Sequence, residues 1–467
     1  MTHKCRLSLR ESSVFPFFCR AKDNNHWYRH KAILPIVLML PVVLLLASVG
    51  LLVRNEYVAS LQLQKEVAAI RDAKLPFDSL SLSQHFFNTT SQEQSTAWRE
   101  VLSAISSIDQ RAQEAAKIYK PNYSYEIELL PSPGVDGKVD WPAAAAFEEY
   151  SRDAQSVIKR IEALTHDPKP TWQPLNIVGE ATWLPDSQAS LSISRMLAAE
   201  FCYAIYIKDS NRALRALRLD AASMVVYDWQ VFSATDSITC MRKVSLCERI
   251  RASLAHNIWT QEQLDAISTL VGPEPELASR WHRTLATDRA MCLASIGANS
   301  GEMLSTYASG GKLVTRPASY QLELLRQATR NMDAGTGGYQ GLADRVRASK
   351  LKFQISSPKF LLYFLGEEEP YQWSGEFSFV ESYAADCERC ENSRRLTRNA
   401  LATKQYQHQN KRWPATLAEL SEATLPWSDR TTLIDDPFEY RIAPDSKSCF
   451  IGTNDLRNVA VSETEIR

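Results

Sequence analysis

The hydrophobic pattern of the chain is dominated by one segment close to its N-terminus. Ala32 to Val53 form the apolar stretch AILPIVLMLPVVLLLASVGLLV, which contains no charged residue. As an α-helix it would extend about 33 Å, close to the roughly 30 Å hydrocarbon core of a bilayer. Pro35, Pro41 and Gly50 are compatible with such a helix, because proline and glycine are common in membrane helices. The pattern predicts a transmembrane helix over residues 32–53.

Charge gives this predicted helix a direction. Residues 1–31 carry seven basic and two acidic side chains, a net charge of +5, so the remaining residues account for −6 of the total of −1. The positive-inside rule then predicts a cytoplasmic tail over 1–31 and an exported C-terminal part. A cleaved signal peptide is the alternative. The basic region and the apolar run are both longer than a signal peptide usually has, which favours an uncleaved signal-anchor in the cell membrane.

Beyond the anchor, apolar residues recur at helical spacing. A stalk helix is expected over 54–76, with Val58, Leu61 and Val67 on its apolar side and Pro76 at its end. Further helices are expected from Thr90, where Thr90 and Glu93 have capping-box spacing, to Tyr119, and from Asp140 to Leu164.

Several long amphipathic segments follow between residues 187 and 296, separated by short breaks. Thr260 and Gln263 have capping-box spacing at the start of one of them. Short connections between long helices predict antiparallel neighbours. We therefore expect a mostly α fold, with an antiparallel helical-hairpin body over 77–380.

One segment of this body has the residue pattern of a known helical hairpin. Ala199, Tyr203, Asp209, Ala213 and Leu214 stand at the small and apolar packing positions of such a hairpin. The segment resembles one tetratricopeptide-like hairpin. The resemblance covers about 40 residues and does not recur at the period of about 34 residues that a repeat array would show. It implies helical-hairpin packing and no repeat array.

The C-terminal residues 381–467 have a different character. A long helix is expected over 381–409, a short one over 416–423, and a β-hairpin from the strands 433–442 and 449–452, so this part is a small α+β element. The segment contains an aromatic-Pro step, a spaced Leu pair, and Asp-Pro before a strand that ends in tyrosine. The residues are Tyr406, Trp413, Pro414, Leu417, Leu420, Asp436, Pro437, Phe438, Tyr440 and Arg441.

This pattern resembles the small C-terminal domain of type II secretion pseudopilin-like proteins. Two features depart from it. Lys411 and Arg412 replace the glycine usual before the aromatic-Pro step, and no prepilin-type cleavage site precedes the apolar segment. The resemblance therefore implies a shared small-domain topology and no pilus function. The whole layout also resembles an uncharacterised bacterial family of membrane-anchored helical proteins, which implies no activity.

The cysteines supply the only candidate site. Cys387 and Cys390 form the one CxxC motif, and a simple disulfide or helix-start thiols are favoured for them over a zinc site or redox catalysis. A zinc site would need two more ligands, for which Cys449 and His408 are only guesses. A redox site would follow a strand at a helix start, which the pattern around 387 does not predict. We therefore predict no metal site and no cofactor. Cys387 and Cys390 are the weak candidates for metal ligands.

Other motifs are missing or have ordinary explanations. The glycine-rich segment 333–341 lacks the third glycine of a dinucleotide-binding loop and is interpreted as a helix cap and loop. No nucleophile elbow, P-loop or HExxH motif occurs. The mildly acidic exported part disfavours a nucleic-acid partner. We expect no catalytic residues.

Two hypotheses for function stay open. The first is a membrane-anchored interaction or scaffold module, with the lipid bilayer as partner through residues 32–53 and a protein or envelope component as partner of the body. The second is a membrane-anchored enzyme of the envelope or secretory pathway, with the topology of a glycosyltransferase. The second lacks the parallel α/β sheet pattern and the Asp-x-Asp motif typical of that class.

Overall fold

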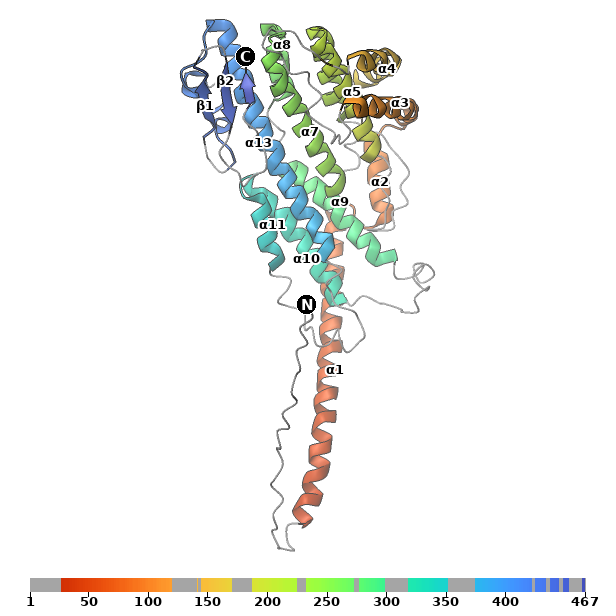
Figure 1. Ribbon diagram of the computed structural model, residues 1–467. Coiled ribbons are helices and arrows are strands. Elements are labelled where there is room, and N and C mark those ends of the chain that lie inside the picture. The colour runs from red at the N-terminus through yellow and green to blue at the C-terminus, as the bar shows by residue number, and fades with distance from the viewer. Residues whose placement is uncertain are drawn as a thin grey trace, which may run out of the picture. The chain divides into compact units, whose positions relative to one another are not determined.

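The computed structural model shows a mostly helical protein with a small antiparallel sheet, as the sequence predicts (Figure 1). The chain divides into two compact units, residues 1–61 and 62–467. The structure describes residues 27–119, 141, 144–169, 187–224, 232–272, 277–298, 318–351, 374–421, 425–433, 437–444, 448–452 and 464–466.

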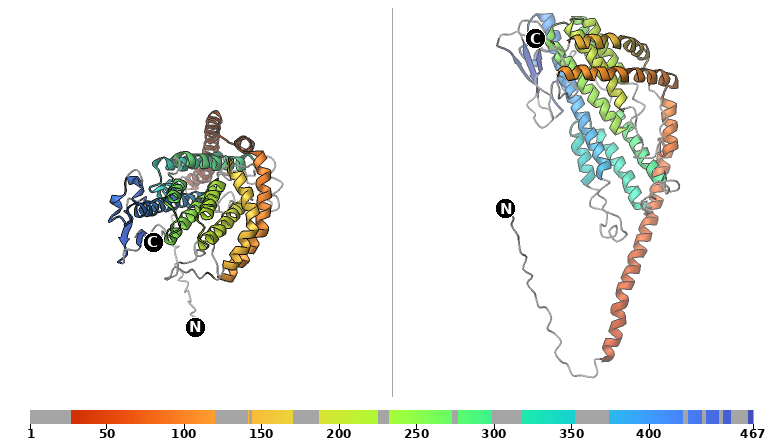
Figure 2. Two further views of the ribbon diagram at one scale, coloured as in Figure 1. Left: turned by 90° about the horizontal axis from the view of Figure 1, so that it is seen from above. Right: turned by 45° about the vertical axis from the view of Figure 1, so that its right-hand side comes forward.

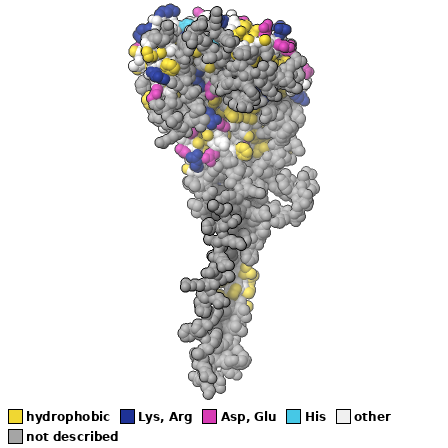
Figure 3. All heavy atoms as spheres, in the orientation of Figure 1, with side chains coloured by type: hydrophobic (Ala, Val, Ile, Leu, Met, Phe, Trp, Pro, Cys, Tyr) yellow, Lys and Arg dark blue, Asp and Glu magenta, His cyan; other side chains and the backbone are white. Residues whose placement is uncertain are grey.

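The first element, α1 (Trp27–Asp72), runs without a break through the predicted membrane segment and most of the predicted stalk. Its large apolar side chains are exposed: Met39 is 60%, Leu46 65% and Val53 65% accessible. Within the described residues, α1 is the one helix long and apolar enough to cross a membrane. Figure 3 shows hydrophobic side chains on its described part, whereas charges of both signs are scattered over the body.

The last turns of α1, from Gln62, belong to the second unit. Ile70 forms an apolar cluster with Leu293 and Leu325. Arg326 bonds to Glu66 at 3.3 Å and to Gln62 at 3.1 Å. Part of the predicted stalk is therefore packed into the body.

A helix that the pattern did not predict, α2 (Ser79–Thr89), follows α1. Asp78 and Ser81 form its capping box. The next helix, α3 (Gln92–Tyr119), starts two residues after the predicted position. The Thr90 hydroxyl donates back to the Phe86 carbonyl at 2.8 Å, and Ser91 accepts from the Gln94 N–H instead. The predicted capping role of Thr90 is wrong, because Thr90 ends the unpredicted α2 and Ser91 takes the capping position of α3.

Several helices pack against a neighbour in sequence. Glu100 of α3 pairs with Arg160 of α4 (Ala144–Thr165). Gln94, earlier in α3, bonds to the carbonyl of Asp167, beyond the end of α4. α4 therefore runs back along α3. The same holds for α5 (Ser187–Tyr206) and α6 (Ser210–Ser223), which Asp209 caps through the Arg212 N–H.

The middle of the chain forms α7 (Ser233–Ser253), α8 (Gln261–Leu270) and α9 (Leu277–Ala298). Thr260 and Gln263 make both bonds of the capping box that the sequence predicts for α8. α10 (Ala318–Ala334) packs against α9, and α11 (Leu342–Leu351) packs against α10.

The glycine-rich segment between α10 and α11 is a loop closed around an arginine. The guanidinium of Arg345 donates to the carbonyls of Ala334, Gly338 and Gln340. Gly338 has φ 76°, which glycine adopts without strain. A Cβ on Gly335 would lie 2.1 Å from Trp281 Cδ1, so the bare backbone is needed there. The loop is a structural connection, in agreement with its predicted role.

The C-terminal part begins with α13 (Ser374–Asn410), which is longer than predicted and packs against α7, α8 and α11. A three-stranded antiparallel sheet follows, with β2 (Cys449–Gly452) between β1 (Glu439–Ile442) and β3 (Thr464–Ile466). The β1–β2 pair, with Tyr440 opposite Ile451, is the predicted hairpin, although β1 begins later than predicted. β3 was not predicted. Figure 2 shows the sheet beside the C-terminal half of α13.

Candidate functional site: the polar interface of α7 and α13

The chemically richest part of the described structure is the interface between α7 and α13. Its contacts advance together along both helices: Asp236 meets Tyr383, Cys240 meets Cys387, and Arg251 meets Ser393 and Thr397. The two helices are therefore parallel, although more than a hundred residues separate them in sequence. They lie side by side in Figures 1 and 2.

Near the start of α7, a buried carboxylate is held by an arginine and a tyrosine. Asp236 accepts from Arg280 Nε at 2.9 Å and from the Tyr383 hydroxyl at 2.5 Å. Burial alone would raise the pKa of Asp236, but the bonds to Arg280 and Tyr383 outweigh it and lower the pKa below its usual value. Burial and the Asp236 charge raise the pKa of Tyr383 well above its usual range. The carboxylate is ionised and the phenol neutral.

A second carboxylate lies close by. Asp288 of α9 accepts the backbone N–H of Ser233, the first residue of α7, at 3.1 Å. Burial raises the pKa of Asp288 to about 6, and the nearby Asp236 charge adds to this effect. Asp288 therefore changes protonation near neutral pH, in contrast to Asp236.

One turn further along, the interface holds sulfur. The Sγ atoms of Cys240 and Cys387 are 4.0 Å apart, and both side chains are buried. Cys390 is also buried, and its interaction with Cys240 acts to lower the pKa of Cys240. The bond to Cys387, together with burial, keeps the pKa of the Cys240 thiol well above its usual value. We call Cys240, Cys387 and Cys390 the thiol cluster.

At the far end of α7, an arginine is buried against neutral groups. Arg251 donates to the Ser393 carbonyl, the Ser393 hydroxyl and the Thr397 hydroxyl at 2.8–3.1 Å. Its side chain is 3% exposed, and burial lowers its pKa. Three oxygen acceptors orient the guanidinium without neutralising it.

The other side of α13 holds the small C-terminal element through charge. Asp429 accepts from Arg394 at 2.8 Å and also pairs with Arg398. The backbone N–H of Leu433 donates to Asn392 at 2.9 Å. Tyr440 on β1 donates to the Pro414 carbonyl at 2.7 Å, which links β1 to the segment that follows α13.

A further buried network joins α7 to the α5–α6 hairpin. Asp220 pairs with Arg242 at 2.7 Å and with Arg249, and all three side chains are at most 5% exposed. Ser194 donates to the same carboxylate at 3.2 Å. These ion pairs hold α7 in position against α6.

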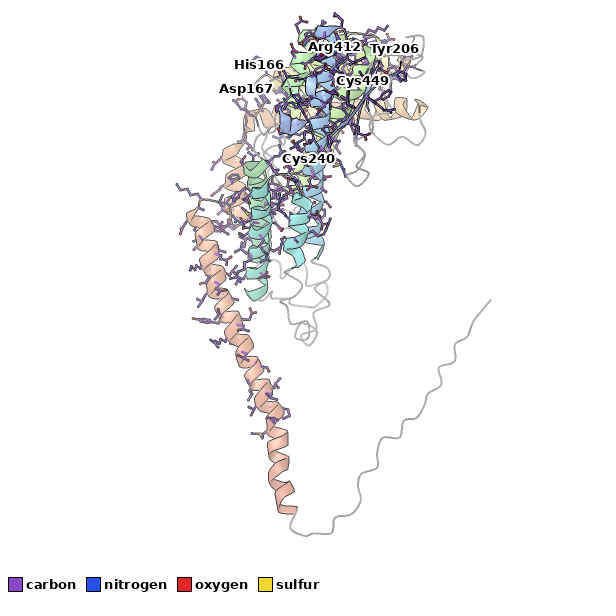
Figure 4. The ribbon with its side chains drawn as sticks, turned by 90° about the vertical axis from the view of Figure 1, so that its left-hand side faces the viewer. His166, Asp167, Tyr206, Cys240, Arg412 and Cys449 are labelled. Carbon is purple, nitrogen blue, oxygen red and sulfur yellow. The ribbon has the colours of Figure 1, made fainter. Side chains whose placement is uncertain are left out.

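The structure places the predicted CxxC in the interior of α13, away from a helix start. No disulfide joins Cys387 to Cys390 in this structure, and the sulfur in contact with Cys387 belongs to Cys240. Figure 4 shows Cys240 well apart from Cys449, the cysteine proposed as a further zinc ligand. In the described part of the chain, no group of three or more His, Cys, Asp or Glu side chains is arranged to hold a metal ion. A disulfide between Cys387 and Cys390 stays a prediction.

Sequence reasoning missed the Asp236–Arg280–Tyr383 network. The available signal was negative: α7, with the sequence SATDSITCMRKVSLCERIRAS, has no continuous apolar stripe and yet is mostly buried. A helix that is polar on every side and not solvent-exposed must pair its polar groups internally. The partners could not be identified, because Tyr383 lies 147 residues away.

Comparisons with protein-family models, curated proteins and solved structures found no match to this chain.

Proposed function

We propose that this chain is a single-pass membrane protein whose helical body lies outside the cytoplasm and serves as an interaction scaffold for a protein or another envelope component. The observation that carries the proposal is the uncovered apolar part of α1. From Met39 to Val53 its large apolar side chains are about half exposed or more, which in water would be costly over such a length. A bilayer removes this cost.

The direction of the tether follows from charge. The tail of 1–31 has a net charge of +5, and basic residues next to a membrane helix stay in the cytoplasm. Residues 62–467 are then exported as one compact unit.

The scaffold role is supported by the way the body uses its charged groups. The buried carboxylates Asp220, Asp236 and Asp429 each bond to arginines of other helices or segments, which fixes the helices relative to one another. Such pairs specify one arrangement more than they add stability. A body of fixed shape suits recognition of a partner.

One exposed feature offers a place to test recognition. Leu80 and Phe87 on α2 are 65% and 51% exposed. They are seven residues apart, so they lie on the same face of the helix. Exposed apolar side chains on one face are typical of contact surfaces.

The test is crosslinking in intact membranes followed by purification of the full chain under denaturing conditions. We expect a specific partner, and we expect the variant Leu80→Ser/Phe87→Ser to recover less of it. Ile207→Ser, which removes an exposed apolar side chain outside α2, is the matched control and should recover the wild-type amount. Recovery of no partner above the background of an unrelated single-pass protein would contradict the scaffold role. Equal recovery by all variants would contradict a contact through α2.

A further inference from the structure

The thiol cluster lies between two helices that are far apart in sequence. Cys240 belongs to α7 and Cys387 to α13. Their sulfurs are 4.0 Å apart, within reach of a bond of about 2.05 Å after a small shift of both side chains. We propose that Cys240 and Cys387 form a disulfide that links α7 to α13.

The alternative within the CxxC motif has poorer geometry. Residues three apart in a continuous helix have Cβ atoms about 5–6 Å apart. A disulfide needs Cβ atoms about 3.5–4.5 Å apart. Cys387 and Cys390 lie inside the long helix α13, so a bond between them would unwind a turn of it. Cys240 and Cys387 belong to two different helices, so a bond between them is not limited by the Cβ spacing within one helix.

The third thiol has a separate part in this arrangement. Cys390, also buried, remains a thiol when Cys240 and Cys387 are joined. The cluster therefore holds one disulfide and one adjacent thiol.

The chemistry is a thiol–disulfide exchange with an external disulfide, either oxidised glutathione or a disulfide-bearing oxidoreductase. One cysteine thiolate attacks the external disulfide, forms a mixed disulfide and releases one thiol. The second cysteine thiolate attacks the mixed disulfide at the protein sulfur and releases the other thiol. The protein loses two electrons and two protons, and the external disulfide gains them as two thiols.

Burial determines when this exchange takes place. Cys240 and Cys387 are 6% and 4% exposed, and the thiolate form of Cys240 is strongly disfavoured after folding. The exchange therefore precedes the docking of α13 on α7, while both thiols are still open to solvent. Reduction of the folded protein should be slow for the same reason.

Trypsin separates the three thiols, which makes the bond directly measurable. Cleavage after Arg242, Lys359 and Arg389 gives peptides 219–242, 360–389 and 390–394, each with one cysteine of the cluster. The full chain is taken from membranes by acid quenching, blocked with N-ethylmaleimide, digested and analysed by mass spectrometry. We expect peptides 219–242 and 360–389 to be linked in most molecules.

A second experiment tests whether the disulfide can form without relying on which side of the membrane the body occupies. The purified full chain is reduced, loosened with urea and returned to native conditions in a glutathione redox buffer. The same linked pair should form, and Cys240→Ser should abolish it. Cys202→Ser removes a buried cysteine of α5 outside the cluster and should leave the link intact. The oxidised wild type should melt about 2–5 °C higher than the reduced form, a difference absent from Cys240→Ser.

The two experiments test the disulfide separately from the proposal that the body is exported. A link formed in the redox buffer but absent from membrane extracts would support the geometry and contradict an oxidising location. A link between 360–389 and 390–394, or no link in either arm, would overturn the proposal even if the body is shown to be exported.

Discussion

The pair α3–α4 and the pair α7–α13 show two opposite ways to join helices. In α3–α4 the inner face is apolar, with Trp98, Ile105 and Ile158 at most 1% exposed, and the ion pair Arg160–Glu100 lies at the surface. In α7–α13 polar groups are inside: Asp236 of α7 accepts from Tyr383 of α13 and also pairs with Arg280 of α9. The first pair is held by non-directional burial, and the second by directional bonds that specify register. The two pairs should therefore respond differently to loss of a charge, to truncation of an apolar side chain, and to pH.

The largest expected effect is loss of the carboxylate that joins α7 to its neighbours. Asp236→Ala removes the carboxylate that pairs with Arg280, which is 13% exposed, and that accepts from the Tyr383 hydroxyl. We expect the free energy of unfolding to fall by about 3–5 kcal/mol. Urea denaturation of the detergent-solubilised chain measures it. A loss below about 1 kcal/mol would show that charge does not hold this interface.

In the α3–α4 pair, the corresponding loss comes from an apolar residue. Ile105→Ala removes a fully buried side chain from the cluster that also contains Trp98 and Ile158. We expect a cost of about 2–4 kcal/mol, with little dependence on salt or pH, because the lost term is transfer and packing. The same urea experiment at low and high salt checks this. A strong salt dependence of this cost would contradict an apolar interface between α3 and α4.

The two carboxylates near the start of α7 predict opposite pH dependences. Asp288 has its pKa raised to about 6, so its folded form holds a proton that the unfolded chain, with a pKa of about 4, has lost. Its contribution falls as pH rises through that window. Asp236 has a lowered pKa, so its contribution is lost as pH falls below the unfolded value.

Substitution isolates the Asp288 contribution. The stability of Asp288→Asn relative to the wild type should rise as pH increases from about 4 to about 6 and then level off. Unfolding measured across this range for both proteins gives the difference. A flat difference would show that Asp288 titrates normally in the folded chain.

The smallest expected effect is loss of the surface ion pair of α3–α4. Glu100 is 62% and Arg160 47% exposed, so water screens their attraction. Glu100→Ala should cost at most about 1 kcal/mol. It is also the control for Asp236→Ala, because both substitutions remove one carboxylate from an arginine. Similar costs for the two would remove the distinction between the pairs.

Features whose partners are close in sequence could be predicted better than contacts between distant segments. The start of α8 followed from Thr260 and Gln263, because both partners of that cap lie within one turn. The break at Asp209 and the β1–β2 hairpin are local in the same sense. The capping role of Thr90 was predicted wrongly, because α2 was not expected. The Thr90 hydroxyl donates to the carbonyl of Phe86 in that helix.

The parallel packing of α7 on α13 depends on contacts that local patterns do not contain. Short connections predict neighbours in sequence, whereas these helices are joined by a long path through α8 to α11. Cys387 and Cys390 are recognisable from their spacing. Cys240 is not recognisable as their partner, because it lies 147 residues before Cys387. The candidate site is therefore mostly a product of tertiary packing.

The central claim is that α1 holds an exported body at the membrane. It is tested most directly by two reporters fused after Arg467: a phosphatase active only outside the cytoplasm and a fluorescent protein that matures only inside it. We predict an active phosphatase and no fluorescence, and a weaker bias when Lys22, Arg29 and Lys31 are changed to Glu. Fluorescence with an inactive phosphatase would contradict the orientation, and recovery of the full chain in the soluble fraction would contradict the anchor.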